Sequence, residues 1–582
     1  MLTQRCGLQL ASTNFRPHFM VFLAIELCLT ALCVALAQVY PTVGQGWFRS
    51  IERRFAGYAQ HRVRTIVTIG LLALALRLVL LPQLPIPQPK VVDEFGYLLL
   101  SDTFSHGRLT NPTHPMWIHF ETFLENWKPT YASMYYPGYG LFLAFGQSIM
   151  GHPFWGVWLS SGLMCAAICW ALYGWVPPGW ALLGSLLVVV RIATYSYWVD
   201  SYWGGTVTAL GGALVLGALP RIVRNLRVVD SVLLAMGMAT LEYTRPYEGL
   251  FFCLPVLGAL VFWQVRKNAL PWKLAMLRVA LPVAFIMLVA TLALGYYFYR
   301  VTGSPLTTPY QVNMRTYGLL YFPWQKITPV EFHHEALRTF YRGGPVVGWY
   351  EVAREHPLKL QLLKIWVIWL FYFGPILSLP CLAWLFTRSK RAFWKSFSAE
   401  FRLLVLLCAV TYLSCILTIY VGQPHYVAQL TVVFYAIMLL MMRDMYESGN
   451  LSLKFLVRCV PLVCFVLFLA RAAAPALHVT PPPSWTRIWC SQDEQNFERA
   501  RLLNKLEQMP GQQLVIVRYG SEHNLILNEW VFNNADIDGS KVIWARDMGV
   551  QNSELVQFFS NRRAWLVEAD LKPPRLSPYV EQ

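Results

Sequence analysis

The sequence predicts an all-α polytopic membrane protein of about twelve transmembrane helices, followed by a small C-terminal α/β domain. Of its 582 residues 56% are hydrophobic and only 14% are charged, whereas soluble domains are about 25% charged. About twelve stretches are apolar over the roughly 20 residues that a membrane-spanning helix needs. The excess of basic residues, a net charge of +17, lies between these stretches. These observations exclude an ordinary soluble enzyme, a disordered chain and a nucleic-acid-binding protein.

The predicted spans begin with residues 18–40, a helix that includes the pattern Ala35-Leu36-Ala37, typical of a signal-peptide cleavage site. Cleavage there would leave residues 38–64 outside the membrane and would turn every later span against the positive-inside rule. We therefore expect this helix to remain uncleaved. The other predicted spans are residues 65–82, 154–174, 179–197, 204–220, 230–244, 248–265, 274–297, 361–387, 402–421, 427–443 and 453–471.

Five clusters of basic residues fix the orientation of these spans. One alternating path places all five on the same face, which the positive-inside rule makes cytoplasmic. The same path places the three longest hydrophilic stretches, residues 83–153, 298–360 and 472–582, on the opposite side. The clusters are Arg53, Arg54, Arg62 and Arg64; Arg221, Arg224 and Arg227; Arg266 and Lys267; Arg388, Lys390, Arg391 and Lys395; and Arg443 with Lys454.

The chain divides into three predicted regions. Residues 1–64 hold an extra N-terminal transmembrane helix and a cytoplasmic loop, and residues 65–471 form the main transmembrane domain with outer loops 83–153 and 298–360. Residues 472–582 form an extracytoplasmic α/β domain that opens on a stiff linker, Pro481-Pro482-Pro483.

The hydrophobic pattern of this last region predicts helices over residues 492–508 and near 553–560, and strands over Gln513–Tyr519, Lys541–Arg546 and Arg563–Glu568. Its sequence contains no GxGxxG motif, P-loop or CxxC pair. The sequence therefore assigns it no chemistry, and an accessory or acceptor-positioning role is a hypothesis only.

Neither cysteine nor histidine spacing gives a clear disulfide or metal pattern. Most of the 12 cysteines lie in apolar stretches, so we interpret them as inert buried thiols. The stretch Glu331-Phe332-His333-His334-Glu335 in the second outer loop could bind a metal, but adjacent histidines cannot both ligate from one helix face. The cofactor therefore stays unknown, with a divalent metal as one candidate.

Two adjacent carboxylates, Asp93 and Glu94, follow the second span by about ten residues, at the start of a predicted surface helix. Adjacent side chains on a helix do not share a face, so we expect the two acids to play different parts. An ionised, positioned aspartate is a plausible general base for an acceptor hydroxyl. The alternative is that both acids only stabilise the N-terminus of a helix, whose dipole favours negative charge.

Two more charged positions lie at outer ends of spans. Asp200 closes the aromatic stretch that begins at Tyr195, and it could be a helix cap or a site residue. Arg245 lies in a tight turn between two apolar spans, where an unpaired charge is costly. It could pair with Glu242 or Glu248, or it could hold an anionic headgroup.

His425 and Tyr426 begin a late span at the same outer face. A lone histidine there could be structural or could contact a phosphate or a sugar. Arg191 instead lies inside a span and is expected to snorkel or to pair within a polar cavity. The outer residues come from four different helix ends, and they could converge on one cavity that receives the charged head of an amphiphile.

The order of these motifs resembles the GT-C superfamily of polytopic glycosyltransferases, which use lipid-linked sugars. It is most similar to the branch that holds the protein O-mannosyltransferases and the aminoarabinose transferase of lipid A, over roughly residues 65–471. The resemblance rests on Asp93-Glu94-Phe95-Gly96-Tyr97, on Pro137-Gly138-Tyr139-Gly140-Leu141-Phe142 through Gly151, on the turn from Tyr195 to Asp200, and on His425-Tyr426.

This resemblance implies a GT-C fold with Asp93 as the general base and with Glu94 and Asp200 as supporting or metal-linked acids. Two positions depart from the branch. Tyr136 stands where the aminoarabinose transferase has a lysine, which leaves Lys128 as the nearest lysine, and His425 stands in place of an arginine. The identity of the donor does not carry over through these differences. The predicted substrate-binding residues are Tyr97, Lys128, Arg245, His425 and Tyr426.

We therefore expect a membrane glycosyltransferase that moves a sugar from a polyprenyl-phosphate donor to an acceptor hydroxyl on the extracytoplasmic side, with inversion at the anomeric carbon. Its expected partners are this donor, membrane lipids and a glycan, lipid or protein acceptor, but no nucleic acid. The resemblance suggests a bacterial inner membrane, with the site and the C-terminal domain in the periplasm. The alternatives are a transporter or flippase of a lipid-linked or anionic substrate and a non-catalytic partner in envelope assembly.

Overall fold

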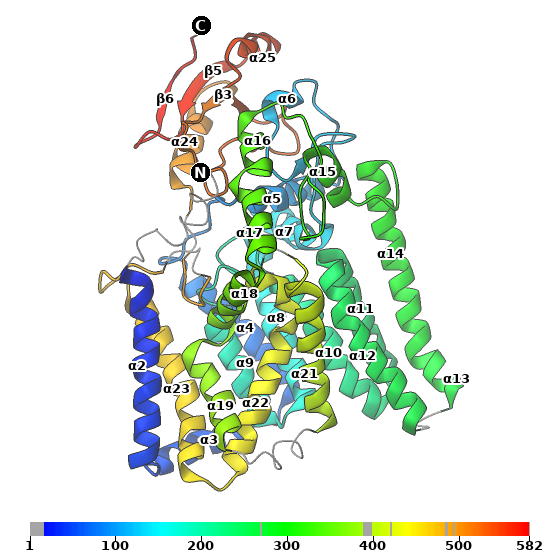
Figure 1. Ribbon diagram of the computed structural model, residues 1–582, viewed down its shortest axis with the longest axis vertical. Helices are drawn as coiled ribbons and strands as arrows, with labels where there is room; N and C mark the ends of the chain where they lie inside the picture. The colour runs from blue at the N-terminus through cyan, green and yellow to red at the C-terminus, as the bar shows by residue number, and fades with distance from the viewer. Residues whose placement is uncertain are drawn as a thin grey trace.

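The computed structural model of the chain describes residues 17–267, 271–387, 398–419, 422–482, 487–492 and 495–580. Figure 1 shows a bundle of helices with a small sheet domain at its upper end. Several residues named above lie outside the described part of the chain: Pro483 and the cluster Arg388, Lys390, Arg391 and Lys395, together with the side chains of Arg266 and Lys267.

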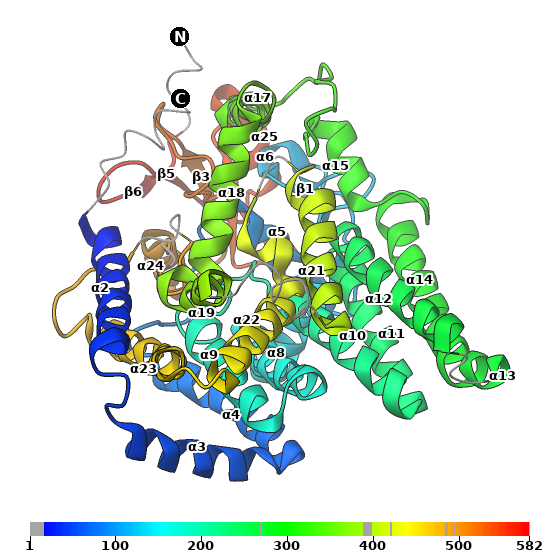
Figure 2. The same cartoon turned by 60° about the horizontal axis from the view of Figure 1, so that its bottom comes forward.

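The N-terminal helix α2 (Pro17–Val39) runs along one edge of the bundle and packs against α19 (Gly374–Thr387) and α23 (Leu451–Ala473). Its polar anchor is Glu26, whose buried carboxylate lies 3.4 Å from the guanidinium of Arg191 in α9 (Pro178–Ile192). Pairing lowers the cost of keeping both charges among apolar helices. Helix α3 (Gln45–Ala59) then crosses the lower end of the bundle (Figure 2), and α4 (Arg62–Val79) leads back into it.

The centre of the bundle is formed by helices that bury most of their surface against other helices. In the most apolar 18-residue window of the span Pro424–Glu447, 78% of the residues are buried, against 6% in the corresponding window of Trp272–Thr302, which lies at the periphery (Figure 1). The remaining elements are α8 (Phe154–Trp175), α10 (Thr206–Asn225), α11 (Val228–Thr244), α12 (Pro246–Lys267), α13 (Trp272–Ala275), η1 (Met276–Ala280), α14 (Leu281–Thr302), α18 (Pro357–Tyr372), α21 (Ala399–Thr411), η3 (Tyr412–Ile416), η4 (Pro424–Leu430) and α22 (Thr431–Glu447).

The predicted helical membrane fold is confirmed. Among the described residues eight helices are long and apolar enough to cross a membrane, or nine if one bent pair counts as a span. Each of the twelve predicted stretches contains helix within the described residues, but α9 and α11 have only 15 and 17 residues. Helix α4 carries Arg62, Arg64 and Arg77 within its 18 residues.

The predicted span 361–387 consists of two helices, because the chain bends by 100° between α18 and α19. The break falls at Gly374, whose φ of 60° lies in the left-handed region that glycine adopts without strain. A Cβ atom at this position would lie 2.8 Å from Nη2 of Arg191 and from Oε1 of Glu26. Glycine therefore permits both the bend and the buried ion pair beside it.

The two outer loops fold over the end of the bundle that faces the sheet domain (Figure 1). In the first loop α7 starts with a proline, whose fixed φ suits a first helical turn, and ends at Gly151 with a φ of 75°. The first loop contains α5 (Val92–Ser105), α6 (Trp117–Phe120), β1 (Glu125–Asn126), β2 (Ala132–Ser133) and α7 (Pro137–Met150), and the second contains α15 (Pro309–Tyr317), α16 (Glu335–Arg342), η2 (Gly344–Gly348) and α17 (Trp349–Glu355).

The C-terminal region folds into a four-stranded sheet with the order β4-β3-β5-β6. β3 pairs in parallel with both β4 and β5, which the long connection 519–541 and the helical connection η6–α25 permit, whereas β6 is an antiparallel edge strand that was not predicted. β6 is short, follows two prolines and is mostly exposed, so it lacks a buried-strand pattern. The elements are α24 (Phe497–Gln508), β3 (Gln513–Arg518), β4 (Val542–Arg546), η6 (Gly549–Gln551), α25 (Asn552–Phe558), β5 (Arg563–Glu568) and β6 (Arg575–Pro578).

Buried polar contacts attach this sheet domain to the first outer loop. Arg546 of β4 donates to the backbone oxygen of Glu121 at 2.6 Å and pairs with Glu529 at 2.9 Å. The carboxylate of Asp102 in α5 accepts the backbone N–H of Ala535 at 2.8 Å. The sheet domain is therefore fixed directly above α5.

Candidate active site

Asp93 lies in the first turn of α5, half-buried at the boundary between the first outer loop and the bundle. Its Oδ1 accepts a 2.6 Å hydrogen bond from the hydroxyl of Tyr135. Burial raises the pKa of the Asp93 carboxyl, while the Tyr135 hydroxyl and the positive charges of Arg487 and Arg245 oppose that rise. The result is a carboxylate held in place by one hydrogen bond in a field of two arginines.

Glu94 points away from Asp93 and has a structural environment. Only 3% of it is exposed, and its Oε2 accepts the backbone N–H groups of Lys90 and Val91 at 2.9 and 3.0 Å. Its Oε1 accepts the N–H of Tyr202 at 3.0 Å. Glu94 thus caps the start of α5 and ties it to the turn between α9 and α10, as the separate faces of adjacent helical residues require.

Asp200 is fully buried in that turn and faces α4. Its Oδ1 lies 3.5 Å from Nη2 of Arg77, whose other nitrogens donate to the carbonyls of Val199 and Leu84 at 3.1 and 2.8 Å. This ion pair holds the turn between α9 and α10 against α4. The sequence does not indicate a role for Arg77, because a basic residue near the end of an apolar helix is common in membrane proteins.

Arg245 follows the last residue of α11 and carries one of the two charges near Asp93. Its Nη1 donates to Oε1 of Glu248 at 3.1 Å, and its guanidinium carbon lies 4.3 Å from the centre of the Tyr426 ring. The ion pair fixes the guanidinium, and the ring face adds a cation–π contact. One of the predicted pairings, that with Glu248, is therefore present, and the same arginine also acts on Asp93.

His425 and Tyr426 lie in η4, at the start of a central span. Nδ1 of His425 is 2.8 Å from the hydroxyl of Tyr197, in the aromatic turn that also contains Asp200. The motifs around residues 93, 197, 245 and 425 are thus brought together, whereas the sequence separates them by up to 332 residues (425 minus 93).

The second charge near Asp93 comes from Arg487, which the sequence did not reveal. It is 7% exposed and follows the proline-rich linker, and its guanidinium carbon lies 4.9 Å from the ring centre of Tyr197 and 4.6 Å from that of Trp203. Arg487 belongs to no recognisable motif, and the sequence around it is typical of a linker. Only the tertiary fold shows that residues after the last span reach the site.

Tyrosine rings from both outer loops form the other side of the site. Tyr97 stacks on Tyr135 with ring centres 4.3 Å apart, and Tyr310 of α15 meets Tyr135 edge-on at 5.8 Å. Burial raises the pKa of Tyr135 and Tyr97 well above the ordinary tyrosine range, so both stay protonated donors at neutral pH. The pair Tyr135-Tyr136, just before the helix-starting Pro137, is the one sequence signal that could have indicated Tyr135.

Lys128 does not join this cluster. Its side chain is exposed, and Nζ lies 4.8 Å from the ring centre of Trp117 in α6. The structure therefore places Asp93, Tyr97, Arg245, His425 and Tyr426 around one site, with Glu94 and Asp200 as supports beside it and Lys128 elsewhere.

The histidines of the second outer loop contact Glu121 of the first loop. Nδ1 of His333 is 3.1 Å from Oε2 of Glu121, and Nε2 of His334 is 3.7 Å from the same oxygen. Burial and the charge of Arg546 lower the pKa of His334 to about 3, so it is a neutral ring that links the loops. Within the described ranges no group of three or more His, Cys, Asp or Glu side chains could hold a metal ion.

No protein-family model matches the chain, and no curated protein matches it. Among solved structures the fold is similar to the apo oligosaccharyltransferase of Archaeoglobus fulgidus, with 10% identity, a TM-score of 0.43, and coverage of 78% of this chain and 62% of that one. It is also similar to ArnT from Cupriavidus metallidurans bound to undecaprenyl phosphate, with 11% identity, a TM-score of 0.46, and coverage of 90% and 96%. The chain thus spans less than two thirds of the archaeal protein.

Proposed function

We propose that this chain is a membrane glycosyltransferase, which moves a sugar from a polyprenyl-phosphate donor to an acceptor hydroxyl at the end of the bundle covered by the sheet domain. The observation that carries the proposal is the pairing of one positioned carboxylate, Asp93, with two arginine charges at the boundary between apolar helices and polar loops. The order of the sequence motifs around Asp93, which resembles that of GT-C glycosyltransferases, also supports the proposal. The basic clusters that the sequence places on the opposite face support the extracytoplasmic side.

In the proposed reaction the acceptor oxygen attacks the anomeric carbon while its proton passes to a carboxylate oxygen of Asp93. The bond between that carbon and the phosphate oxygen breaks, and the polyprenyl phosphate leaves with the electron pair. Arg245 and Arg487 stabilise the negative charge that develops on the phosphate. One direct displacement inverts the anomeric centre, because no carboxylate nucleophile takes part.

The surrounding carboxylates support this assignment of roles. Glu94 accepts three backbone N–H groups, Asp200 pairs with Arg77, and Glu248 pairs with Arg245. Each of them is therefore committed to a structural contact, which leaves Asp93 as the acid best placed to exchange a proton. Within the described residues these carboxylates do not form a ligand set for a divalent cation.

The transporter alternative requires working charges deep within the bundle. Arg191, which the sequence places inside a span, forms an ion pair with Glu26 of α2 and also donates to the carbonyl of Phe373 at 2.9 Å. Such a pair is suited to holding α2, α9 and α19 together. This observation favours the enzyme over the transporter.

The first test is transfer of radiolabelled sugar from polyprenyl-phosphate donors in membranes of the source cell, with wild type compared with Asp93→Asn. We expect the substitution to lower the rate by about 10²–10⁴, the usual contribution of a general base. Glu335→Gln is the matched control, since it removes an exposed carboxylate of the second outer loop.

Three outcomes separate the hypotheses. Transfer that depends on Asp93 supports the enzyme, and the fraction that receives label identifies a glycan, lipid or protein acceptor. Full transfer activity of the Asp93→Asn variant would contradict the assignment of Asp93 as the general base. Movement of labelled donor across the membrane without transfer would favour a flippase.

A further inference from the structure

A cavity of about 1140 Å³ lies at the end of the bundle opposite the sheet domain. It is bordered by the lower ends of α8, α10, α12, α21 and α22 (Figure 1). This volume exceeds the roughly 300–1,000 Å³ of ordinary small-molecule sites. None of the residues around Asp93 lines this cavity.

The wall of this cavity is largely apolar. Trp175, Trp263 and Leu403 line it, and Leu406 is 49% exposed and continues the apolar wall to the outer surface of the helices. Gly258 of α12 leaves the wall open, because a Cβ atom built there meets no other atom within 4 Å. The cavity can therefore take hydrocarbon chains that enter from the membrane.

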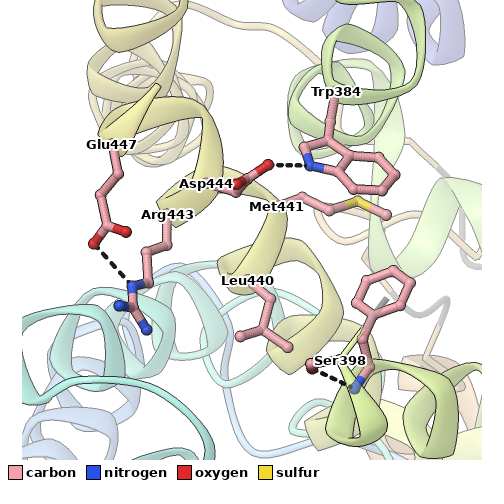
Figure 3. Close-up of a pocket in the computed structure, with 8 residues that line it drawn as sticks. Trp384, Ser398, Leu440, Met441, Arg443, Asp444 and Glu447 are labelled. Atoms are coloured by element: carbon pink, nitrogen blue, oxygen red, sulfur yellow. Dashed lines mark hydrogen bonds and ion pairs between the residues drawn. The ribbon is translucent and has the colours of Figure 1, made fainter. Parts of the chain in front are cut away.

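The charged residues of this cavity are mostly basic. Arg224, Arg402 and Arg443 border it together with a single carboxylate, Glu400. A smaller neighbouring cavity of about 180 Å³ shares Arg443, and Figure 3 shows this arginine turned to Glu447, 2.9 Å away. Arg224 and Arg402 have no ion-pair partner within the described ranges. Their charges are thus available for an anionic group.

We propose that this cavity binds an anionic phospholipid of the leaflet at this end of the bundle. The headgroup phosphate lies between Arg224 and Arg402, and the acyl chains lie along Trp175, Trp263 and Leu406. The site also faces the N-terminus of α21, where Ser398 caps the helix, and a helix N-terminus favours negative charge. Charge complementarity selects the headgroup, and the apolar wall selects a membrane lipid over a soluble anion.

The test is native mass spectrometry of the full-length, delipidated protein in detergent, titrated with phosphatidylglycerol and with phosphatidylcholine of the same chains. We expect the wild type to prefer phosphatidylglycerol and the double variant Arg224→Gln/Arg402→Gln to lose that preference. The expected loss is roughly fivefold in affinity for each arginine, from about 1 kcal/mol per basic residue near an anionic headgroup. Arg53→Gln, which changes an exposed arginine of α3 at the same end, is the control.

A second variant tests the apolar part of the site. Gly258→Phe is expected to fill the cavity and to reduce binding of both lipids, whereas Gly57→Phe in α3, also with open space around it, leaves binding unchanged. Equal binding of the two lipids by wild type would overturn the proposal, as would an unchanged preference in the double arginine variant. Full binding by Gly258→Phe would place the lipid elsewhere and would also overturn it.

Discussion

At the scale of single residues, the site depends on one carboxyl whose proton affinity is set by its neighbours. Burial raises the pKa of Asp93, and the Tyr135 hydroxyl bond and two arginine charges limit the rise. A general base must be ionised to act. We therefore expect kcat/KM to fall as the pH falls through the raised pKa of Asp93, above the usual range of an aspartate.

Removal of the Tyr135 hydroxyl should shift the acidic limb of the pH profile of kcat/KM, which is the range where activity falls as the pH is lowered. The hydroxyl donates to Oδ1 of Asp93 at 2.6 Å and so stabilises the ionised form. In Tyr135→Phe the pKa rises further, and the acidic limb of the pH profile of kcat/KM moves to higher pH. Tyr296→Phe is a control, because this exposed hydroxyl lies outside the cluster and receives a bond from Arg300. An unmoved limb would mean that another group sets the profile.

Glu94 offers a contrast with its neighbour at the same scale. Its carboxylate receives three backbone N–H groups in a buried position. Glu94→Ala leaves these donors without an acceptor, which costs about 1–3 kcal/mol for a buried group of this kind. We expect a lower unfolding temperature for Glu94→Ala in detergent, and no such loss for Asp93→Asn.

The sequence predicted the members of the site that interrupt apolar spans with charge. Asp93, Arg245 and His425 stand out because polar residues at helix ends in a membrane protein need a reason. The roles of Glu94 and Asp200 could not be predicted, since their partners are backbone groups and an arginine brought close only by packing. Arg487 and Tyr135 gave no local signal for the same reason.

At the scale of elements, the sharpest departure from the sequence prediction is the bend between α18 and α19. A continuous apolar stretch predicts one straight helix, and hydrophobicity carries no information about a φ of 60° at Gly374. The three short or charged helices α4, α9 and α11 show the same limit. Apolar composition locates helices well but does not set their length or angle.

The variant Gly374→Ala should show how much the glycine at this bend contributes to the stability of the protein. The left-handed φ costs a non-glycine residue on the order of 1 kcal/mol, and the added Cβ would press on Arg191 and Glu26 at 2.8 Å. We expect a destabilised protein with a lower unfolding temperature. The control is Gly258→Ala, where the new methyl group has open space; equal stability of the two variants would contradict this view of the break.

At the scale of the whole molecule, the sheet domain is bound to the first outer loop through buried charge. Arg546 pairs with Glu529 and donates to the backbone of Glu121, and all three are nearly inaccessible to water. Removing one partner of a buried ion pair costs about 3–5 kcal/mol. We expect Arg546→Gln to loosen the sheet domain, seen as faster hydrogen exchange in β3 and β4. Arg563→Gln, with an exposed side chain in β5, should leave exchange unchanged.

The position of Arg487 has a consequence for the order in which this protein is made. Ribosomes synthesise the elements that hold Asp93, Arg245 and His425 first, whereas Arg487 lies 14 residues beyond Ala473, the last residue of α23. A nascent chain halted after its last span would already be anchored in the bilayer, yet its site would lack one of its two cations. In the proposed enzyme, the site therefore gains its second arginine only after the final segment has been made and has folded against the bundle.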